Sequence, residues 1–253
     1  MTNHENSGDK FSFKRFDIGY NPSVMRVNTD SVLLGAWMSA LDSGHVLDIG
    51  TGSGLIALMA AQRCVNCSIE SIDIDLKACF EARENVRNSP WSDRIQVFYC
   101  SLQEFSRLHP EKYQLIACNP PYYKIRSSAK SFKNYARQQV KMSFRELLIG
   151  VNRLLDKSGC FALVLPATAS LPFVEMASVY NLYPKREYAV SLKYGKPPAR
   201  VLLELVRGLT NTECRQFDLE SSDGVWSNEY LQLIRDFYIK LNPDSTILSL
   251  YKQ

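Results

Sequence analysis

The sequence predicts an α/β fold in which a mostly parallel sheet of seven strands carries helices on both faces. From residue 44 onward, short apolar runs alternate with amphipathic stretches, and the connections between them are short. Such alternation is typical of right-handed βαβ units. A glycine-rich segment follows the first apolar run, at the kind of turn where open α/β sheets bind ligands.

The composition predicts one soluble globular domain that spans residues 1–253. Hydrophobic residues make up 45% of the chain and charged residues 22%, which is ordinary for such a protein. No apolar run approaches the roughly 18 residues of a membrane span, and the polar N-terminus has no apolar signal region. Seven cysteines without a secretory signal favour a reducing compartment. We expect a cytoplasmic protein, with a monomer as the simplest oligomeric state.

Short runs rich in apolar and β-branched residues mark the strands. The first of them, HVLDIG, follows an N-terminal extension, residues 1–43. The last two flank the segment GKPPAR and are candidates for an antiparallel pair at the edge of the sheet. In chain order, the expected strands occupy residues 45–50, 68–74, 94–99, 113–119, 160–166, 183–193 and 199–208.

Apolar residues at helical spacing mark the helices between the strands. We expect Thr29 or Asp30 to cap the first helix and Asp75 to cap the third, which the pair Ser89-Pro90 ends. In chain order, the expected helices occupy residues 28–41, 54–63, 76–88, 102–108, 144–155, 168–180 and 227–241.

The glycine-rich segment DIGTGSG joins the first strand to its helix. Glycine lets the backbone bend tightly and lets a ligand approach closely, although the same pattern also occurs in plain tight turns. Asp73 ends the second strand, where a carboxylate can accept both hydroxyls of a ribose. These observations predict a nucleotide site at Asp48, Gly50, Thr51, Gly52, Gly54 and Asp73.

The spacing of this segment favours S-adenosylmethionine over a dinucleotide. The glycines follow the pattern G-x-G-x-G, since Leu55 stands where the dinucleotide pattern G-x-G-x-x-G requires glycine. Asp48 precedes the first glycine by two positions. A carboxylate there would attract the amino group of S-adenosylmethionine and repel a pyrophosphate.

The segment NPPY ends the fourth strand and predicts a clamp for a flat, amine-bearing group. The side-chain oxygen of Asn119 can accept one hydrogen of an amine, and the carbonyl of Pro120 can accept the other. Pro121 stiffens the corner, and Tyr122 can stack on a planar ring. By itself, the motif could also be only a rigid strand-ending turn.

A basic segment follows the clamp directly and contains no acidic residue between residues 124 and 145. Basic side chains neutralise phosphates, and the interleaved aromatic residues can stack on unpaired bases. A solvated loop is the alternative interpretation. A second, weaker cluster surrounds Lys196. The candidate RNA-binding residues are Lys124, Arg126, Lys130, Lys133, Arg137 and Lys196.

Cys64 and Cys67 have the spacing of half a zinc site. A structural zinc needs four ligands, and no second pair with suitable spacing follows. We therefore expect two buried small side chains and no metal.

Taken together, VLDIGTGSG, Asp73 and NPPY resemble class I methyltransferases that use S-adenosylmethionine to methylate amino nitrogens. The opening segment FKRFDIGYNPSVMRVNTDSVLLGAW and the late segment DGVWSNEYLQLIRDFYIKL resemble one bacterial family more specifically. That family methylates N6 of adenine 37 in the anticodon loop of valine tRNA. The resemblance runs from about Phe11 to Leu241, nearly the whole chain.

The resemblance implies a Rossmann-like fold and adds residues to the site. It implies that the stretch from Arg26 through Thr29 to Asp30 closes over the methionine end of the cofactor, with the N-terminal extension as a cover. Such enzymes often carry an acid after the third strand, where this chain has Ser101. Other targets stay open, namely an amino group of another RNA or DNA base or of a protein glutamine. A non-catalytic module that binds cofactor and RNA is a further alternative.

Overall fold

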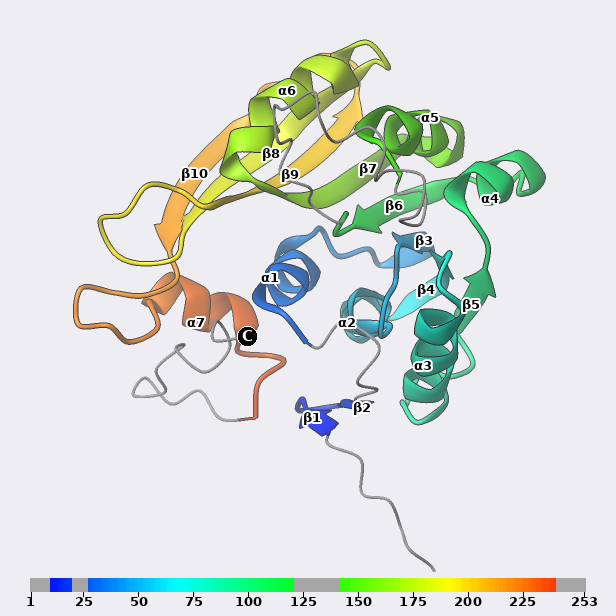
Figure 1. Cartoon of the computed structure of the whole chain (residues 1–253), viewed down its shortest axis with the longest axis horizontal. Helices are drawn as coiled ribbons and strands as arrows, with labels where there is room; N and C mark the ends of the chain where they lie inside the picture. Colours follow the sequence, from blue (N-terminus) through cyan, green and yellow to red (C-terminus); the bar gives the residue numbers. More distant parts are fainter. Residues whose placement is uncertain (1–9, 20–26, 121–141, 240–253) are drawn as a thin grey trace, which may run out of the picture.

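A computed structural model of the chain describes residues 10–19, 27–120 and 142–239. Its main sheet has eight strands in the order β10-β8-β9-β7-β6-β3-β4-β5 (Figure 1). The strands are β3 (Ser43–Ile49), β4 (Asn66–Asp73), β5 (Ile95–Tyr99), β6 (Tyr113–Cys118), β7 (Leu155–Pro166), β8 (Leu182–Ser191), β9 (Arg200–Arg207) and β10 (Glu213–Asp218).

Helices cover both faces of this sheet. One hydrophobic cluster lies between the sheet and α1, α2, α3 and α7, and a second lies between the sheet and α4, α5 and α6. The helices are α1 (Thr29–Trp37), α2 (Leu55–Arg63), α3 (Leu76–Arg87), α4 (Leu102–Leu108), α5 (Phe144–Leu154), α6 (Ala167–Ser178) and α7 (Asn228–Ile234). The predicted three-layer architecture is therefore confirmed.

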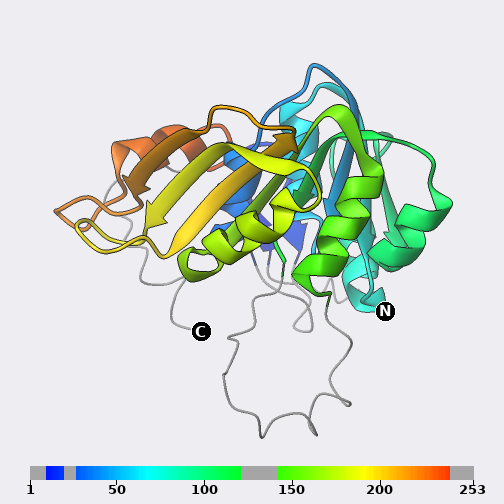
Figure 2. The same cartoon turned by 90° about the horizontal axis from the view of Figure 1, so that it is seen from above.

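The strand directions confirm a mostly parallel sheet with an antiparallel pair among the late strands. β3, β4, β5, β6 and β7 run parallel to their neighbours among themselves, whereas β9 is antiparallel to both β7 and β8. Figure 2 shows β8, β9 and β10, coloured yellow to orange, side by side at one end of the sheet.

The predicted count of seven strands is wrong, because β10 pairs with β8 as an eighth strand at the edge. The first four residues of β10, ECRQ, are exposed, so no buried apolar face marks this strand in the sequence.

The order of the strands creates a switch point between β3 and β6. The chain runs outward from β3 through β4 to β5 and then returns to the other side of β3 as β6. In the register of this pair, Ile49 lies opposite Cys118. Ligands of open α/β sheets bind beyond the carboxyl ends of strands at such a point. The segments that follow Ile49 and Cys118 therefore border the expected site.

The cap of helix α1 lies one residue before the first of the two predicted caps. Its cap is Asn28, whose side-chain oxygen accepts a hydrogen bond from the amide of Ser31 at 2.8 Å. Thr29 is the first helical residue, so neither Thr29 nor Asp30 is the cap. Asp75 caps α3 as predicted and accepts from the amide of Lys77 at 2.8 Å.

Aromatic side chains join the two ends of the described chain. A short hairpin, β1 (Lys10–Ser12) and β2 (Asp17–Gly19), precedes α1. Phe13 next to β1 forms a backbone bridge with Tyr238, and their rings lie 5.6 Å apart, edge to face. The ring of Tyr238 also contacts that of Trp226 at 5.7 Å. Helix α7 ends at Ile234, earlier than predicted, and a turn that includes Phe237 leads to Tyr238.

Candidate active site

The glycine-rich loop after β3 borders open space. Gly50, Gly52 and Gly54 have positive φ angles of 72°, 56° and 85°, which other residues adopt only with strain. A Cβ atom at Gly50 or Gly52 would meet no atom within 4 Å, whereas one at Gly54 would lie 3.4 Å from Ala82 of α3. The first two glycines thus leave room for a ligand, and the third allows the loop to pack on α3.

Asp73, at the end of β4, holds this loop in place. Its Oδ2 accepts a hydrogen bond from the amide of Gly52 at 2.9 Å, and its Oδ1 accepts one from the amide of Asp75 at 2.9 Å. Ionised carboxylates that accept amide hydrogens fix a loop firmly, because such bonds are stronger than neutral ones. The structure therefore brings Asp73 to the predicted nucleotide site, where the carboxylate also orders the loop.

Asp48 lies beneath the loop with no exposure to solvent. Its Oδ2 accepts a hydrogen bond from the hydroxyl of Thr51 at 2.7 Å, and its Oδ1 has no hydrogen-bond partner within the described part of the chain. Burial raises the pKa of Asp48 to about 7 and the charge of Asp73 adds to the rise, while the Thr51 hydroxyl and the Ala57 amide oppose it.

This arrangement fits S-adenosylmethionine. A buried carboxylate with an unsatisfied oxygen is destabilised, and a cation beside it would relieve that cost. The amino group of the methionine moiety is such a cation. The open space beside Gly50 and Gly52 leaves room for the rest of the same ligand.

Asn119 and Pro120 stand at the tip of β6, beside the glycine-rich loop. The pairing of Ile49 with Cys118 places Gly50 and Asn119 at the same edge of neighbouring strands. The side-chain nitrogen of Asn119 donates a hydrogen bond to the hydroxyl of Ser31 in α1 at 2.9 Å. Pro121 and Tyr122 lie outside the described residues. Ser31 is not among the predicted site residues, because a serine inside a helix pattern carries no sign of a distant partner.

The thiol of Cys118, next to Asn119, lies near enough to Asp48 and Asp73 to be affected by their charges. Burial raises the pKa of the Cys118 thiol well above its usual range, and the charges of Asp48 and Asp73 add to this effect. The thiol therefore stays protonated and is unsuited to act as a nucleophile.

Two predicted cofactor residues have protein partners. Both carboxylate oxygens of Asp30 accept hydrogen bonds from Nε of Arg200 in β9, at 2.9 and 2.8 Å. Ser101 caps α4 in a capping box, and its hydroxyl donates to Glu104 at 2.9 Å. These contacts engage the Asp30 carboxylate and the Ser101 hydroxyl within the protein. Arg26 lies outside the described residues, and Thr29 is the first residue of α1.

Of the predicted RNA-binding residues, the structure describes only Lys196. It is exposed in the turn between β8 and β9, and the start of β9 pairs with the end of β7 at Pro166. Lys196 therefore lies at the same edge of the sheet as Asn119. The others, Lys124, Arg126, Lys130, Lys133 and Arg137, lie outside the described residues.

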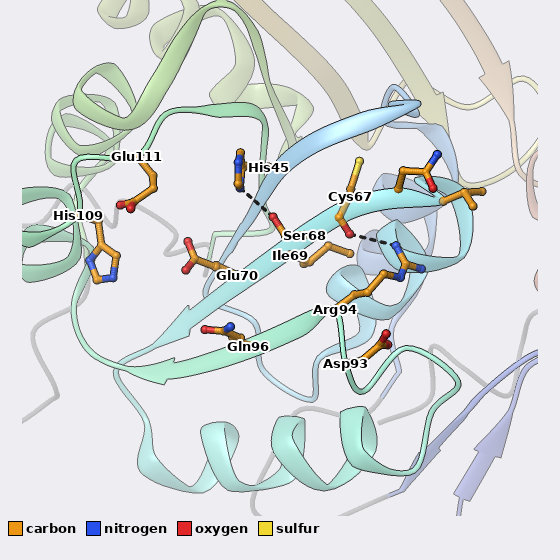
Figure 3. A pocket seen from close by; sticks show the side chains of 12 residues that line it. His45, Cys67, Ser68, Ile69, Glu70, Asp93, Arg94, Gln96, His109 and Glu111 are labelled. Atoms are coloured by element: carbon orange, nitrogen blue, oxygen red, sulfur yellow. Dashed lines mark hydrogen bonds between the residues drawn. The ribbon is translucent and has the colours of Figure 1, made fainter.

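A hollow of about 720 Å³ lies elsewhere, at the amino ends of the parallel strands. Figure 3 shows His45, Glu70, His109 and Glu111 around it. His45 shares a hydrogen bond with Ser68 at 2.8 Å, and Glu70 accepts one from the hydroxyl of Tyr113. The side chains of His45 and Glu70 therefore already have protein partners. The hollow is separate from the glycine-rich loop and from Asn119.

Over the described ranges, no three His, Cys, Asp or Glu side chains are grouped to hold a metal ion. Cys64 and Cys67 are buried where α2 meets β4, as expected, and both are free thiols. No helix in the part of the chain that the structure describes is long and apolar enough to cross a membrane.

The methyltransferase small domain model matches residues 11–175 of the chain. A crystal structure titled a predicted O-methyltransferase from Agrobacterium tumefaciens shares the fold, with a TM-score of 0.65 and 13% identity over 82% of this chain and 96% of that one.

Curated relatives cover nearly the whole chain. A tRNA1(Val) (adenine(37)-N6)-methyltransferase of Bacteroides fragilis is 40% identical over 91% of this chain and 98% of that protein. Proteins of the same name from Aeromonas salmonicida and Yersinia pestis are 40% and 36% identical, over 93% and 92% of this chain and 99% and 94% of their own lengths. The chain therefore belongs to the methyltransferase small domain family and, within it, to the tRNA1(Val) (adenine(37)-N6)-methyltransferases.

Proposed function

We propose that this protein transfers a methyl group from S-adenosylmethionine to N6 of adenine 37 in the anticodon loop of valine tRNA. The observation that carries this proposal is the position of Asn119, at the tip of β6 and next to the glycine-rich loop after β3. A clamp for an amine and a site for a methyl donor thus share one edge of the sheet. The substrate, adenine 37 of valine tRNA, is inferred from the names of the relatives.

At the cofactor end, Asp48 and Asp73 are the residues that would hold the methyl donor. S-adenosylmethionine supplies a methyl group that its positively charged sulfur already activates. The buried carboxylate of Asp48 would attract the amino group of the methionine moiety by its charge. Asp73 would accept from the ribose, and Gly50 and Gly52 would leave room for the ligand.

At the base end, Asn119 and Pro120 would act on the exocyclic amine of adenine. This amine is a weak nucleophile, because its lone pair is shared with the ring. If the Asn119 oxygen and the Pro120 carbonyl each accept one amine hydrogen, the nitrogen becomes more tetrahedral and its lone pair more available. These bonds strengthen toward the transition state, so they lower the barrier of the reaction.

The transfer itself needs no strong base. The new bond forms between N6 and the methyl carbon while the bond between carbon and sulfur breaks, and its electron pair stays on sulfur. The surplus proton on N6 then leaves to water. Tyr122 would stack on the base and fix its plane, and in-line alignment of nitrogen, carbon and sulfur would supply much of the rate.

RNA would reach the site across its basic edge. Lys196 and the segment that follows Tyr122 would contact phosphates, and an unpaired loop base is less costly to extrude than a paired one. The chain up to residue 43 would act as an extension that covers the cofactor, since Ser31 in α1 already contacts Asn119. A protein that modifies tRNA in this way would work in the cytoplasm. It would act as a monomer, because all residues of the proposed site belong to one copy of the chain.

The test is methyl transfer from labelled S-adenosylmethionine to a transcript of valine tRNA, followed by mass spectrometry of the nucleosides. We expect N6-methyladenosine to form, and a transcript with guanosine at position 37 to stay unlabelled. Labelling of the guanosine-37 transcript would show a different target. Labelling of only ribosomal RNA, DNA or a protein would reject the proposal in favour of another amino substrate.

A further inference from the structure

The side chain of Asn85, in the second half of α3, joins two segments that are far apart in the chain. Its Oδ1 accepts a hydrogen bond from the amide of Gly19, the last residue of β2, at 2.9 Å. Its Nδ2 donates to the carbonyl of Ser53, in the glycine-rich loop, at 2.9 Å. Only 5% of Asn85 is exposed, so both bonds form largely away from water. One carboxamide therefore ties the N-terminal hairpin to the loop that precedes α2.

The two partners leave this carboxamide a single orientation. A backbone amide can only donate a hydrogen bond, and a backbone carbonyl can only accept one. A rotation of the side chain by 180° would turn the Asn85 oxygen toward the Ser53 carbonyl, and both bonds would be lost. The bridge is also tight, because a Cβ atom at Gly19 would lie 3.3 Å from Oδ1 of Asn85. Asn85 thus holds the hairpin and the loop in one arrangement.

Asn85 adds a third support to the glycine-rich loop. The hydroxyl of Thr51 bonds to Asp48 at 2.7 Å. The amide of Gly52 bonds to Asp73 at 2.9 Å. Asn85 bonds to the residue that follows, so three consecutive loop residues are each held by a side chain from a different element, β3, β4 or α3. Supports of this kind fix the geometry of a binding loop before its ligand arrives.

We infer that Asn85 is a positioning residue for cofactor binding, which keeps the glycine-rich loop in its binding conformation and couples that loop to the N-terminal hairpin. This inference rests on the proposed function, since it takes the loop as the site of S-adenosylmethionine. Asn85 acts through the backbone of Ser53. A loop that is already held in place loses less freedom when the ligand binds, so the affinity is higher.

The test is the variant Asn85→Ala, in which the Ser53 carbonyl and the Gly19 amide both lose their bond to the side chain. We expect the Kd for S-adenosylmethionine, measured by calorimetry, to rise about threefold to tenfold, the effect of losing a neutral hydrogen bond. At saturating cofactor, kcat and the KM for tRNA should stay those of the wild type, because the methyl transfer itself uses neither bond. A Kd equal to that of the wild type would overturn the inference.

The matched control is Asn152→Ala in α5. Asn152 is also a helical asparagine, and its side-chain oxygen accepts from Arg207 of β9. Leu155, three residues later, pairs with Tyr113 at the start of β6, so Asn152 lies at the amino edge of the sheet, away from the glycine-rich loop. This variant should lower the Tm and leave the Kd for cofactor unchanged. A rise in Kd as large as that of Asn85→Ala would show that general destabilisation explains the effect, and the inference would fall.

A second measurement uses the wild type, so it decides the coupling even if Asn85→Ala does not fold. Coupling between two parts of a protein is reciprocal, so a bound cofactor must stabilise the docked hairpin. Saturating S-adenosylmethionine should therefore slow hydrogen exchange of the Gly19 amide, followed by NMR, by a factor similar to the change in Kd. In Asn85→Ala this slowing should disappear. Exchange at Gly19 that does not respond to cofactor in the wild type would contradict the inference.

Failure of the proposed function would look different. A wild type that binds S-adenosylmethionine but leaves valine tRNA unmethylated would reject the substrate, and the Kd values of Asn85→Ala and Asn152→Ala would still decide the role of Asn85. A wild type that does not bind S-adenosylmethionine would overturn both the proposed function and this inference.

Discussion

Asp48, one residue before the end of β3, and Asp73, at the end of β4, bond to the same glycine-rich loop. Asp48 accepts from the hydroxyl of Thr51 at 2.7 Å, and Asp73 accepts from the amide of Gly52 at 2.9 Å. The two carboxylates also repel each other, and this repulsion contributes to the raised pKa of Asp48. The site therefore concentrates negative charge where the proposed ligand carries its positive charge.

The first prediction concerns the pH dependence of cofactor binding. The pKa of Asp48 is about 7 without ligand, so below that pH most molecules carry a neutral carboxyl there. An ammonium group favours the ionised form, so affinity should fall as the pH drops below 7, by up to about tenfold per pH unit. Calorimetry at pH 6 in buffers of different ionisation enthalpy should record the release of close to one proton.

The matched ligand for this experiment is 5′-methylthioadenosine, which lacks the amino group. Its affinity should vary much less between pH 6 and pH 8. In Asp48→Asn the binding of S-adenosylmethionine should be weak and nearly independent of pH. Proton release that persists in this variant would show that another group titrates.

A second prediction concerns Asn119. Asn119→Ala should lower kcat roughly 10²–10³-fold, the scale of removing one preorganised hydrogen-bond partner from a transition state. Asn119→Asp keeps an oxygen acceptor and should retain more activity than the Ala variant. Stopped-flow or single-turnover methylation would measure the step directly, with Asn66→Ala at the exposed start of β4 as the control. An Ala variant with most of its turnover would remove Asn119 from the mechanism.

The third prediction separates ligand contact from backbone strain in the glycine-rich loop. Gly52 and Gly208 both have positive φ angles, 56° and 78°, and a Cβ at either would meet no atom within 4 Å. Substitution by Ala should therefore destabilise the protein by a similar amount, about 1 kcal/mol, at both positions. Only Gly52→Ala should also weaken cofactor binding, by about tenfold or more. Equal cofactor affinities in the two variants would place the ligand away from Gly52.

The fourth prediction addresses the basic segment. Replacing Lys130, Lys133 and Arg137 by Ala should raise the KM for tRNA and reduce the slope of affinity against salt concentration by about two, because each phosphate contact releases counterions. The control is a triple variant with the same loss of charge near the amino ends of the strands, at Arg107, Lys112 and Lys157. If both triple variants show the same slope, net charge alone explains the effect.

The sequence predicted the elements that a buried apolar pattern marks. Parallel strands buried on both faces read as continuous apolar runs, so β3 and β6 were located closely. Of β7, only residues 160–166 were predicted, because its exposed start has no apolar run. The pairing of Ile49 with Cys118 places Asn119 beside Gly50, at the edge where open α/β sheets bind ligands.

The features that the sequence did not predict depend on contacts between distant residues. β10 is an edge strand with an exposed, polar start, and only its pairing with β8 defines it. The bonds from Ser31 to Asn119 and from Arg200 to Asp30 join residues 88 and 170 positions apart. No local pattern encodes such pairs. Asn28 was not predicted as the cap, because Asn, Thr and Asp are all common caps and the residue type alone does not choose among positions 28–30.

The contact between the first and last described segments has a consequence for how the protein is made. Lys14 donates from its side chain to the carbonyl of Arg235, 221 residues later, and its amide donates to Phe237. At about 5–20 residues per second, a ribosome needs roughly 10–45 s to supply those partners once Lys14 has been synthesised. Phe13 and its neighbours must wait throughout this interval without their final cover. The N-terminal hairpin is therefore among the last parts to become stable, and its aromatic side chains are the surface that a chaperone would need to shield.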